Sequence, residues 1–381
     1  MKPKIRFKGF EGEWKAEELA HVCSVNRGVR VTRNDLHNNG IYPVYQNTDY
    51  PMGYYTKFNV ESNNPFVIVG GSAGLIGFCH TNFWAADDCV FFGDNPIINK
   101  SFLYNNLIFH KTEIKRNVRG ASVPRLDRET LRKLPVSIPS LPEQQEIASY
   151  FTSLDSQISA STSRLASLKQ MKAASLQAMF PQEGETVPKI RFKGFEGEWK
   201  KVKFSELYER SSIKNDLSFG TDKIISVANM YFIKNSRQVD DDYLRSYNIM
   251  RLGDIAFEGN KSKNFAHGRL VENTIGDGIV SHVFIVMKPI SKNYDLNFWK
   301  YYINNENIMG NILVRSTKSS TMMTDLVVDD FLKESILVPS YEEQIEIGKI
   351  LTSLDRQISL QSQRLEKLKQ IKSACLDKMF V

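Results

Sequence analysis

Two segments of this chain occur twice, and this duplication limits the architectures that the chain can form. Residues 3–15 (PKIRFKGFEGEWK) return unchanged at 188–200, an offset of 185. Residues 141–180 match 341–380 at 21 of 40 positions, with an offset of 200. The 381-residue chain is therefore a tandem repeat of one unit whose second copy is slightly longer.

Between the duplicated segments lie two bodies, 16–135 and 201–335, without comparable identity. The duplicated segments form a frame that is kept, while the domain-sized bodies inside it differ. This pattern favours one scaffold that carries two different recognition domains. The alternative is that the bodies differ only because the sequence of an exposed surface changes fastest after a duplication. The pattern predicts a globular domain, a helical spacer, a second globular domain and a second spacer, at residues 1–140, 141–180, 181–340 and 341–381.

The duplicated C-terminal segments have the 4-3-4 apolar spacing of a heptad seam. Their length, about 38 residues, corresponds to a helix of about 57 Å, which is too long to pack against one small domain. We therefore expect an antiparallel coiled coil with pseudo-twofold symmetry. Lys172 and Lys372 either set its register or lie at its solvated edge. The seam residues are Ile147, Phe151, Leu154, Ile158, Leu165, Leu168 and Met179, and in the second copy Ile347, Leu351, Leu354, Ile358, Leu365, Leu368 and Met379.

Local patterns predict how the remaining segments fold. Ser140 and Ser340 each precede a glutamate by three residues, which is typical of a capping box with Glu143 and Glu343. Polar residues with Pro and Gly make 180–186 a predicted linker. The fold class is α+β: two globular α/β domains and two long antiparallel helices. Strands are predicted at 66–69, 278–287 and 336–338, and short helices at 126–134 and 325–332.

Composition excludes several classes of protein. The four cysteines (Cys23, Cys79, Cys89 and Cys375) form no CxxC pair, so we expect neither a disulfide framework nor a zinc site, and a reducing cytoplasm fits best. The N-terminus lacks the apolar core of a signal peptide, and no stretch of about 18 apolar residues predicts a membrane span.

Catalytic motifs are also missing from the sequence. There is no GxGxxG after a strand, no GxxxxGK[ST], no HExxH and no Asn/Asp-Pro-Pro-aromatic methyltransferase motif. The segment GGSAGLIG at 70–77 lacks the lysine of a phosphate loop, which favours a turn. Asn95-Pro96 is followed by Ile and also favours a turn. Cys79, His80 and Cys89 have no metal-ligand spacing, so we expect no metal.

The whole chain resembles the specificity (S) subunit of Type I restriction-modification systems, and two duplicated motifs support this resemblance. The first is the leader P-K-I-R-F-x-G-F-x-G-x-W, which occurs at 3–14 and 188–199. The other is the doubled P-S-x-x-E-Q-x-x-I, from Pro139 and from Pro339, each followed by T-S-L-D-x-Q-I. Elements of the bodies are similar as well, namely 253–257, the glycine-rich 70–74, Trp84 and Asp87-Asp88.

The resemblance implies a non-catalytic subunit of a methyltransferase and ATP-dependent endonuclease complex. Each of two target recognition domains would read one half of a split sequence in double-stranded DNA. The helices would act as a ruler and dock two methyltransferase (M) subunits, which restriction (R) subunits then join. This chain would bind no cofactor itself, whereas S-adenosylmethionine, ATP and Mg would be bound by its partners.

Charge is distributed unevenly along the chain, whose formal net charge is +7. Residues 1–140 carry +5, the first helical segment is neutral, and the second body is close to neutral. Neutral helices suit protein partners, whereas a basic first body suits DNA. The near-neutral second body is a point against DNA binding unless its basic residues are segregated on one surface.

Candidate DNA-binding residues follow from residue type, since Arg and Lys read guanine or phosphate and Asn and Gln read adenine. For each single position, a solvated surface role is an equally good interpretation. In the first body the candidates are Arg27, Arg30, Arg33, Gln46, Asn47, Tyr50, Ser72, Lys111, Lys115, Arg116, Arg119 and Arg125. In the second they are Asn229, Tyr231, Asn260, Lys261, Lys263, His282, Lys318 and Ser319.

Two other functions compete with this interpretation. A non-catalytic coiled-coil adaptor without a DNA role would also explain the repeated leader and helices. A self-contained nuclease or methyltransferase is the second alternative, and the missing cofactor motifs argue against it.

Overall fold

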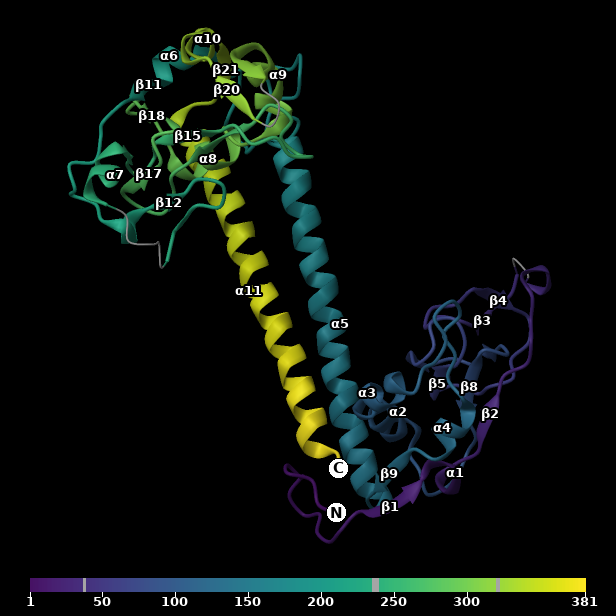
Figure 1. Cartoon of the computed structure of the whole chain (residues 1–381). Helices are drawn as coiled ribbons and strands as arrows, with labels where there is room; N and C mark the ends of the chain where they lie inside the picture. The colour runs from purple at the N-terminus through teal and green to yellow at the C-terminus, as the bar shows by residue number, and fades with distance from the viewer. Residues whose placement is uncertain (37–38, 235–239, 320–322) are drawn as a thin grey trace. The chain divides into compact units, whose positions relative to one another are not determined.

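The structure is a computed structural model that describes the chain in four stretches: 1–36, 39–234, 240–319 and 323–381. These residues form two compact units. Unit 1 comprises Met1–Ser163 and Ser362–Val381, and unit 2 comprises Arg164–Gln361. The boundaries lie within two long helices, α5 (Leu141–Ala178) and α11 (Tyr341–Met379), drawn in teal and yellow in Figure 1. Each unit therefore holds one body, the start of its own long helix and the end of the other.

Unit 1 is organised around a four-stranded antiparallel sheet of order β2-β8-β5-β6. Its central strand β5 (Asn64–Ile68) is buried at every position, as the apolar run at 66–69 predicts. The other sheet strands are β2 (Val25–Arg27), β6 (Ile76–Cys79) and β8 (Cys89–Phe92). A smaller sheet holds β3 (Tyr42–Tyr45), β4 (Gly53–Tyr55) and β7 (Trp84–Ala85). The helical elements are α1 (Leu19–Val22), η1 (Arg33–Asp35), α2 (Lys100–Phe109), α3 (Lys111–Arg116) and α4 (Arg128–Arg132).

Unit 2 contains a four-stranded antiparallel sheet of order β11-β18-β15-β16. Its strands are β11 (Tyr208–Ser211), β15 (Ile255–Glu258), β16 (Arg269–Glu272) and β18 (Ile285–Pro289). Shorter pairs join β12 (Ile225–Ser226) to β13 (Tyr231–Phe232), β14 (Asn248–Met250) to β17 (Gly278–Val280), and β19 (Thr317–Ser319) to β20 (Thr324–Leu326). The helical elements are α6 (Phe204–Leu207), η2 (Thr221–Lys223), α7 (Asp241–Ser246), α8 (Leu296–Tyr302), α9 (Glu306–Ser316) and α10 (Val328–Lys333).

The main sheets of the two units have the same topology although the bodies share no comparable sequence identity. In each sheet the first strand along the chain pairs with the last, the last pairs with the second, and the third forms the edge. In each unit the leader ends in a strand that pairs with the strand before the long helix. These pairs are β1 (Lys15–Glu18) with β9 (Pro135–Ile138), and β10 (Lys200–Lys203) with β21 (Ser335–Val338). Duplication has therefore kept the fold while side chains diverged.

Within each unit the two long helices run antiparallel, which confirms the expected helix pair. In unit 1 the Nζ of Lys372 donates to Asp155 Oδ1 at 2.5 Å. In unit 2 the Nζ of Lys172 donates to Asp355 Oδ1 at the same distance. The lysines therefore make ion pairs from one helix to the other, and their partners are the aspartates of the doubled T-S-L-D motif.

The core of each unit includes a phenylalanine that directly follows the long helix of the other copy. Phe380 is 3% exposed and packs against Trp14 and Phe102 in unit 1. Phe180 is fully buried against Phe298 and Tyr302 in unit 2. The prediction that 180–186 is a polar linker is therefore wrong at its first residue, because Phe180 belongs to the core.

Other local predictions need smaller corrections. The run at 278–287 is not one strand, because a turn at 281–284 separates β17 from β18. The segment predicted as a helix at 325–332 begins as strand β20 and turns helical at Val328. The helix predicted at 126–134 is shorter, as α4. The four-part domain division remains a prediction. Within the described stretches, no helix has the length and apolarity needed to cross a membrane.

Candidate nucleic-acid interface

The duplicated leader attaches each body to the start of its own long helix. Two nitrogens of Arg6 each lie 2.7 Å from an oxygen of Glu143, and Arg191 holds Glu343 at 2.7 and 2.8 Å. Both glutamates are 1% exposed, so these are buried, bidentate ion pairs. One half of the predicted capping box is confirmed in the second copy, where the backbone N–H of Glu343 donates to Ser340 Oγ at 3.3 Å. The other half is wrong, because the carboxylate of each glutamate accepts from a leader arginine.

The glutamine that follows each glutamate aligns a helix of the body. Gln144 Oε1 accepts from the backbone N–H of Asn99 at 2.9 Å, and Gln344 Oε1 accepts from that of Asp295 at 3.2 Å. Asn99 and Asp295 are the N-cap residues of α2 and α8, and their side chains cap those helices. The two positions are therefore equivalent, which fixes the alignment of α2 with α8. The doubled E-Q motif thus positions the bodies.

In unit 1 the turn between β5 and β6 brings several candidates together. Gly71 and Gly74 have φ of +76° and +83°, a left-handed conformation that glycine adopts without strain. This confirms that the glycine-rich segment is a turn. The backbone N–H of Ser72 donates to the carbonyl of Asn47 at 3.0 Å. A Cβ built on Gly74 would contact the side chain of Lys115 at 3.4 Å, so this lysine lies beside the turn.

A second loop, 119–125, lies against the β5–β6 turn. Arg119 and Arg125 pair through two backbone hydrogen bonds of 2.8 and 2.7 Å, and Arg125 also pairs with Gly70. The guanidinium of Arg125 lies 3.3 Å from Asp88, and Arg27 donates to the carbonyl of Asp87 at 2.7 Å. A hollow of about 380 Å³ is lined by Arg27, Asp88, Arg125 and Arg128, among others.

Unit 2 presents an equivalent pair of hairpins. The β15–β16 loop carries Asn260, Lys261 and Lys263, and the β19–β20 hairpin carries Lys318 and Ser319. The two hairpins meet where Asn260 pairs with Met323 and where the N–H of Thr324 donates to the carbonyl of Gly259 at 2.8 Å. In both units, therefore, the loop between the second and third sheet strands packs against the segment just before the last short helix.

Arg269 connects a third segment to the β15–β16 hairpin. Its Nε lies 2.7 Å from Glu258, its Nη2 donates to the carbonyl of Ala228 at 2.6 Å, and its guanidinium lies 5.0 Å from the ring centre of Phe265. The turn that follows Ala228 bears the candidates Asn229 and Tyr231, which are both exposed. No pattern along the chain indicates Arg269, because only the register of β15 against β16 places it opposite Glu258.

The remaining candidates occupy other surface positions. Arg33 lies in η1, and the ring of His282 packs edge-on against Tyr243 at 6.4 Å. Arg128 was missed although it lines the same hollow as Arg27 and Arg125. All twenty candidates remain predictions as DNA contacts. Those not drawn together by the hairpin contacts described above are Arg30, Arg33, Gln46, Tyr50, Lys111, Arg116 and His282.

Burial of acidic groups changes what the net charge of the second body means. Asp254, Glu258 and Glu272 are all less than 9% exposed. Burial raises the pKa of Asp254 to about 6 and raises that of Glu272 well above its ordinary value, and Glu258 is paired with Arg269. Asp254 is still mostly ionised at pH 7, and the charge of Glu258 is balanced by that of Arg269, so only Glu272 lowers the negative charge of the second body.

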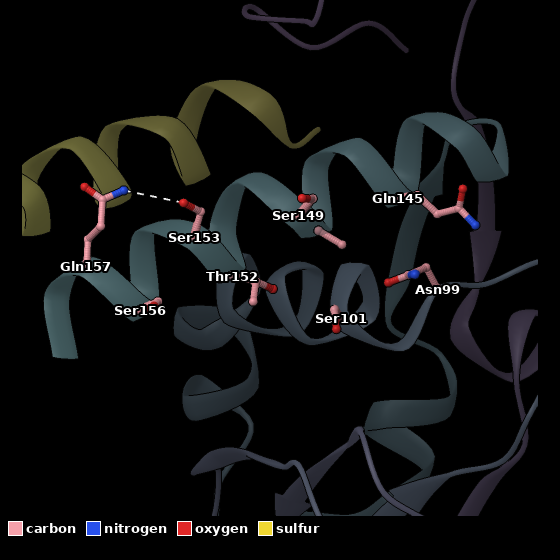
Figure 2. A pocket seen from close by; sticks show the side chains of 9 residues that line it. Asn99, Ser101, Gln145, Ser149, Thr152, Ser153, Ser156 and Gln157 are labelled. Atoms are coloured by element: carbon pink, nitrogen blue, oxygen red, sulfur yellow. Dashed lines mark hydrogen bonds between the residues drawn. The ribbon is translucent and has the colours of Figure 1, made fainter. Parts of the chain in front are cut away.

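A separate, uncharged hollow of about 560 Å³ lies where α2 begins beside α5 in unit 1 (Figure 2). Asn99 and Ser101 line it from the start of α2, and the polar residues of α5 line the opposite side. Gln157 donates to Ser153 at 3.4 Å along α5. Hydroxyl and amide groups without charge suit contact with a protein surface better than contact with phosphate.

Relatives of this chain are specificity subunits. The Type I restriction enzyme MjaVIII specificity subunit of Methanocaldococcus jannaschii is 21% identical over 96% of this chain and 91% of its own length. The Type I restriction enzyme EcoDI specificity subunit of Escherichia coli is 23% identical over 47% of this chain and 40% of its own length.

The fold has a solved counterpart. The crystal structure of a Type-I restriction-modification system S subunit from M. genitalium superposes with a TM-score of 0.66 over 100% of this chain and 99% of that one, at 16% identity. The family model described as Type I restriction modification DNA specificity domain matches residues 11–170 and 196–370. One match lies on each copy of the repeat, and together they cover most of the chain. The chain therefore belongs to the Type I restriction modification DNA specificity domain family.

Proposed function

We propose that each body of this specificity protein reads one half of a bipartite DNA sequence. In unit 1 the reading surface is the β5–β6 turn with the 119–125 loop. In unit 2 it is the β15–β16 loop with the β19–β20 hairpin. The role of the chain is to select the target and not to carry out chemistry on it.

The paired hairpins support this proposal more than any other observation. Both units place a loop between equivalent strands against a second loop that precedes the last short helix. Each pair carries basic or amide side chains, which are the groups that recognise base edges and phosphates. Because the side chains differ while the backbone arrangement repeats, the two units would read different half-sites in the same manner.

The long helices and their partners complete the proposal. The helix pair would set the distance between half-sites and bind two methyltransferase subunits, and restriction subunits would join that complex. S-adenosylmethionine, ATP and Mg would be bound by those partners. A cytoplasmic location follows from a DNA substrate.

Grafting one body onto both frames tests the proposal. Residues 19–134 are replaced by 204–334, so that strands β1 and β9 and the Arg6–Glu143 pair of the first frame stay in place. The graft brings Asp295, the N-cap that Gln344 recognises, to Gln144. With the methyltransferase subunits, the wild-type chain should direct methylation to one asymmetric bipartite sequence, and the graft should direct it to a sequence that contains the second half-site twice. Single-molecule sequencing of methylated DNA measures both.

The reciprocal graft, with 19–134 in both frames, is the matched control and should give the first half-site twice. A graft that folds and assembles but leaves the methylated sequence unchanged would contradict reading by the bodies. Methylation without any sequence preference in the wild-type complex would favour the adaptor hypothesis.

A further inference from the structure

Unit 1 contains a second hollow, of about 570 Å³, lined by residues of α2 and α5. It shares three residues with the hollow of Figure 2, in which Ser101 lies on α2 and Thr152 and Ser156 lie on α5. We call it the Asn105 hollow. It is further lined by Asn63, Phe78, His80, Tyr104, Asn105, Asp155 and Ser159.

The internal repeat shows which side chains contact the equivalent aspartate in unit 2. Since Asn99 is equivalent to Asp295, Asn105 on α2 corresponds to Tyr301 on α8, and Asp155 corresponds to Asp355. The hydroxyl of Tyr301 donates to Asp355 Oδ2 at 2.5 Å. Lys300 reaches the same carboxylate at 3.9 Å and lies 5.0 Å from the Tyr301 ring centre. In unit 2, therefore, an aromatic donor and a cation of the chain itself satisfy the aspartate.

In unit 1 one oxygen of Asp155 has no such donor among the described residues. Asn105 is 2% exposed, and its Oδ1 has no hydrogen-bond partner among the described residues, while its Nδ2 donates to the carbonyl of Ser101. Asp155 accepts from Lys372 through Oδ1 only, as far as the described residues show. Asn105 Oδ1 is itself buried, so the acceptor that a ligand with N–H groups would meet in the hollow is the second oxygen of Asp155.

The walls of the hollow favour a flat cation. Phe78 packs against His80 at 4.9 Å and against Tyr104 at 5.3 Å between ring centres. Burial raises the pKa of Tyr104, and the negative charges of Asp155 and Asp49 raise it further, so the local field attracts positive charge. Aromatic faces beside carboxylate and amide acceptors are the surroundings in which a guanidinium group binds well.

We infer that the Asn105 hollow receives an arginine side chain from a methyltransferase partner subunit. This inference rests on the proposed function. In unit 2 Tyr301 and Lys300 already contact the equivalent carboxylate, so the two units offer a partner unequal binding sites.

Filling the hollow from within tests the inference. Asn105→Tyr copies the unit 2 residue and should place a phenol where the arginine binds. We expect the full-length variant to bind the purified methyltransferase subunit at least tenfold more weakly, measured by isothermal titration calorimetry. His80→Ala removes an exposed part of the aromatic wall and should weaken binding severalfold. Asn293→Tyr, the same change at an exposed site in unit 2, should leave binding unchanged.

The outcomes separate the inference from the proposed function. If folded Asn105→Tyr binds as tightly as the wild-type chain, while the wild-type complex methylates a bipartite site, the inference alone is wrong. If the wild-type chain binds no methyltransferase subunit, the proposed function fails. If Asn105→Tyr loses cooperative melting, His80→Ala decides, and unchanged affinity of that variant overturns the inference.

Discussion

Single residues in the duplicated motifs have defined structural partners. The leader arginines bind the glutamates at the start of the long helices, and the glutamines bind the N-caps of α2 and α8. The motif aspartates bind lysines of the opposite helix. These residues, which are identical in the two copies, therefore connect the leaders, bodies and long helices. The candidates for DNA reading lie in the segments that differ between the copies.

Arg6→Met should destabilise unit 1, because it leaves the buried Glu143 carboxylate without its cationic partner. We expect the free energy of unfolding to fall by about 3 kcal/mol, measured by urea denaturation. Lys8→Met is the control, since Lys8 lies in the same leader and is exposed. Equal losses in the two variants would show that the ion pair does not hold the leader.

Elements meet closely at one glycine of α11. A Cβ on Gly348 would lie 2.6 Å from Asp295 Oδ1 and 2.8 Å from the backbone nitrogen of Phe298, at the start of α8. The first copy has Ala148 at this position, and this alanine is buried. The closer approach of α8 explains why the only interruption in the second helical segment is a glycine.

Gly348→Ala should therefore lower stability by about 1–3 kcal/mol, because the neighbouring backbone must move. Gly310→Ala in α9 is the matched control. Its Cβ would meet only the flexible side chain of Glu306 at 3.4 Å, and alanine favours a helix by up to about 1 kcal/mol. Thermal unfolding should separate the two variants in opposite directions. A stabilised Gly348→Ala would mean that α8 and α11 are less closely packed than described.

At the scale of the whole molecule, each unit is assembled from segments that are far apart in sequence. The last residues of α11 belong to unit 1, and the last residues of α5 belong to unit 2. Phe380 and Phe180 make this exchange stable, because each is buried in an aromatic cluster of the body that its helix reaches. Neither half of the sequence by itself contains all of one unit.

Phe380→Ala should consequently destabilise unit 1 although it is a change near the C-terminus. Truncation of a buried phenylalanine costs about 3–5 kcal/mol. Hydrogen exchange followed by mass spectrometry should show lost protection in the body of unit 1, with β15 and β18 of unit 2 unaffected. Phe180→Ala should show the reverse. Loss of protection confined to α11 would contradict this assignment.

The sequence by itself determined the repeat, the two long helices and the family resemblance, because identity between copies and heptad spacing are local patterns along the chain. It did not show that the two bodies share a sheet topology, since different side chains can satisfy the same pairing. Nor did it show that Arg269 contacts Glu258, Phe265 and the carbonyl of Ala228, or that Tyr301 donates to Asp355 where unit 1 has Asn105 at the equivalent position. Those features depend on strand register and on contacts between residues distant in sequence, which only the tertiary structure decided.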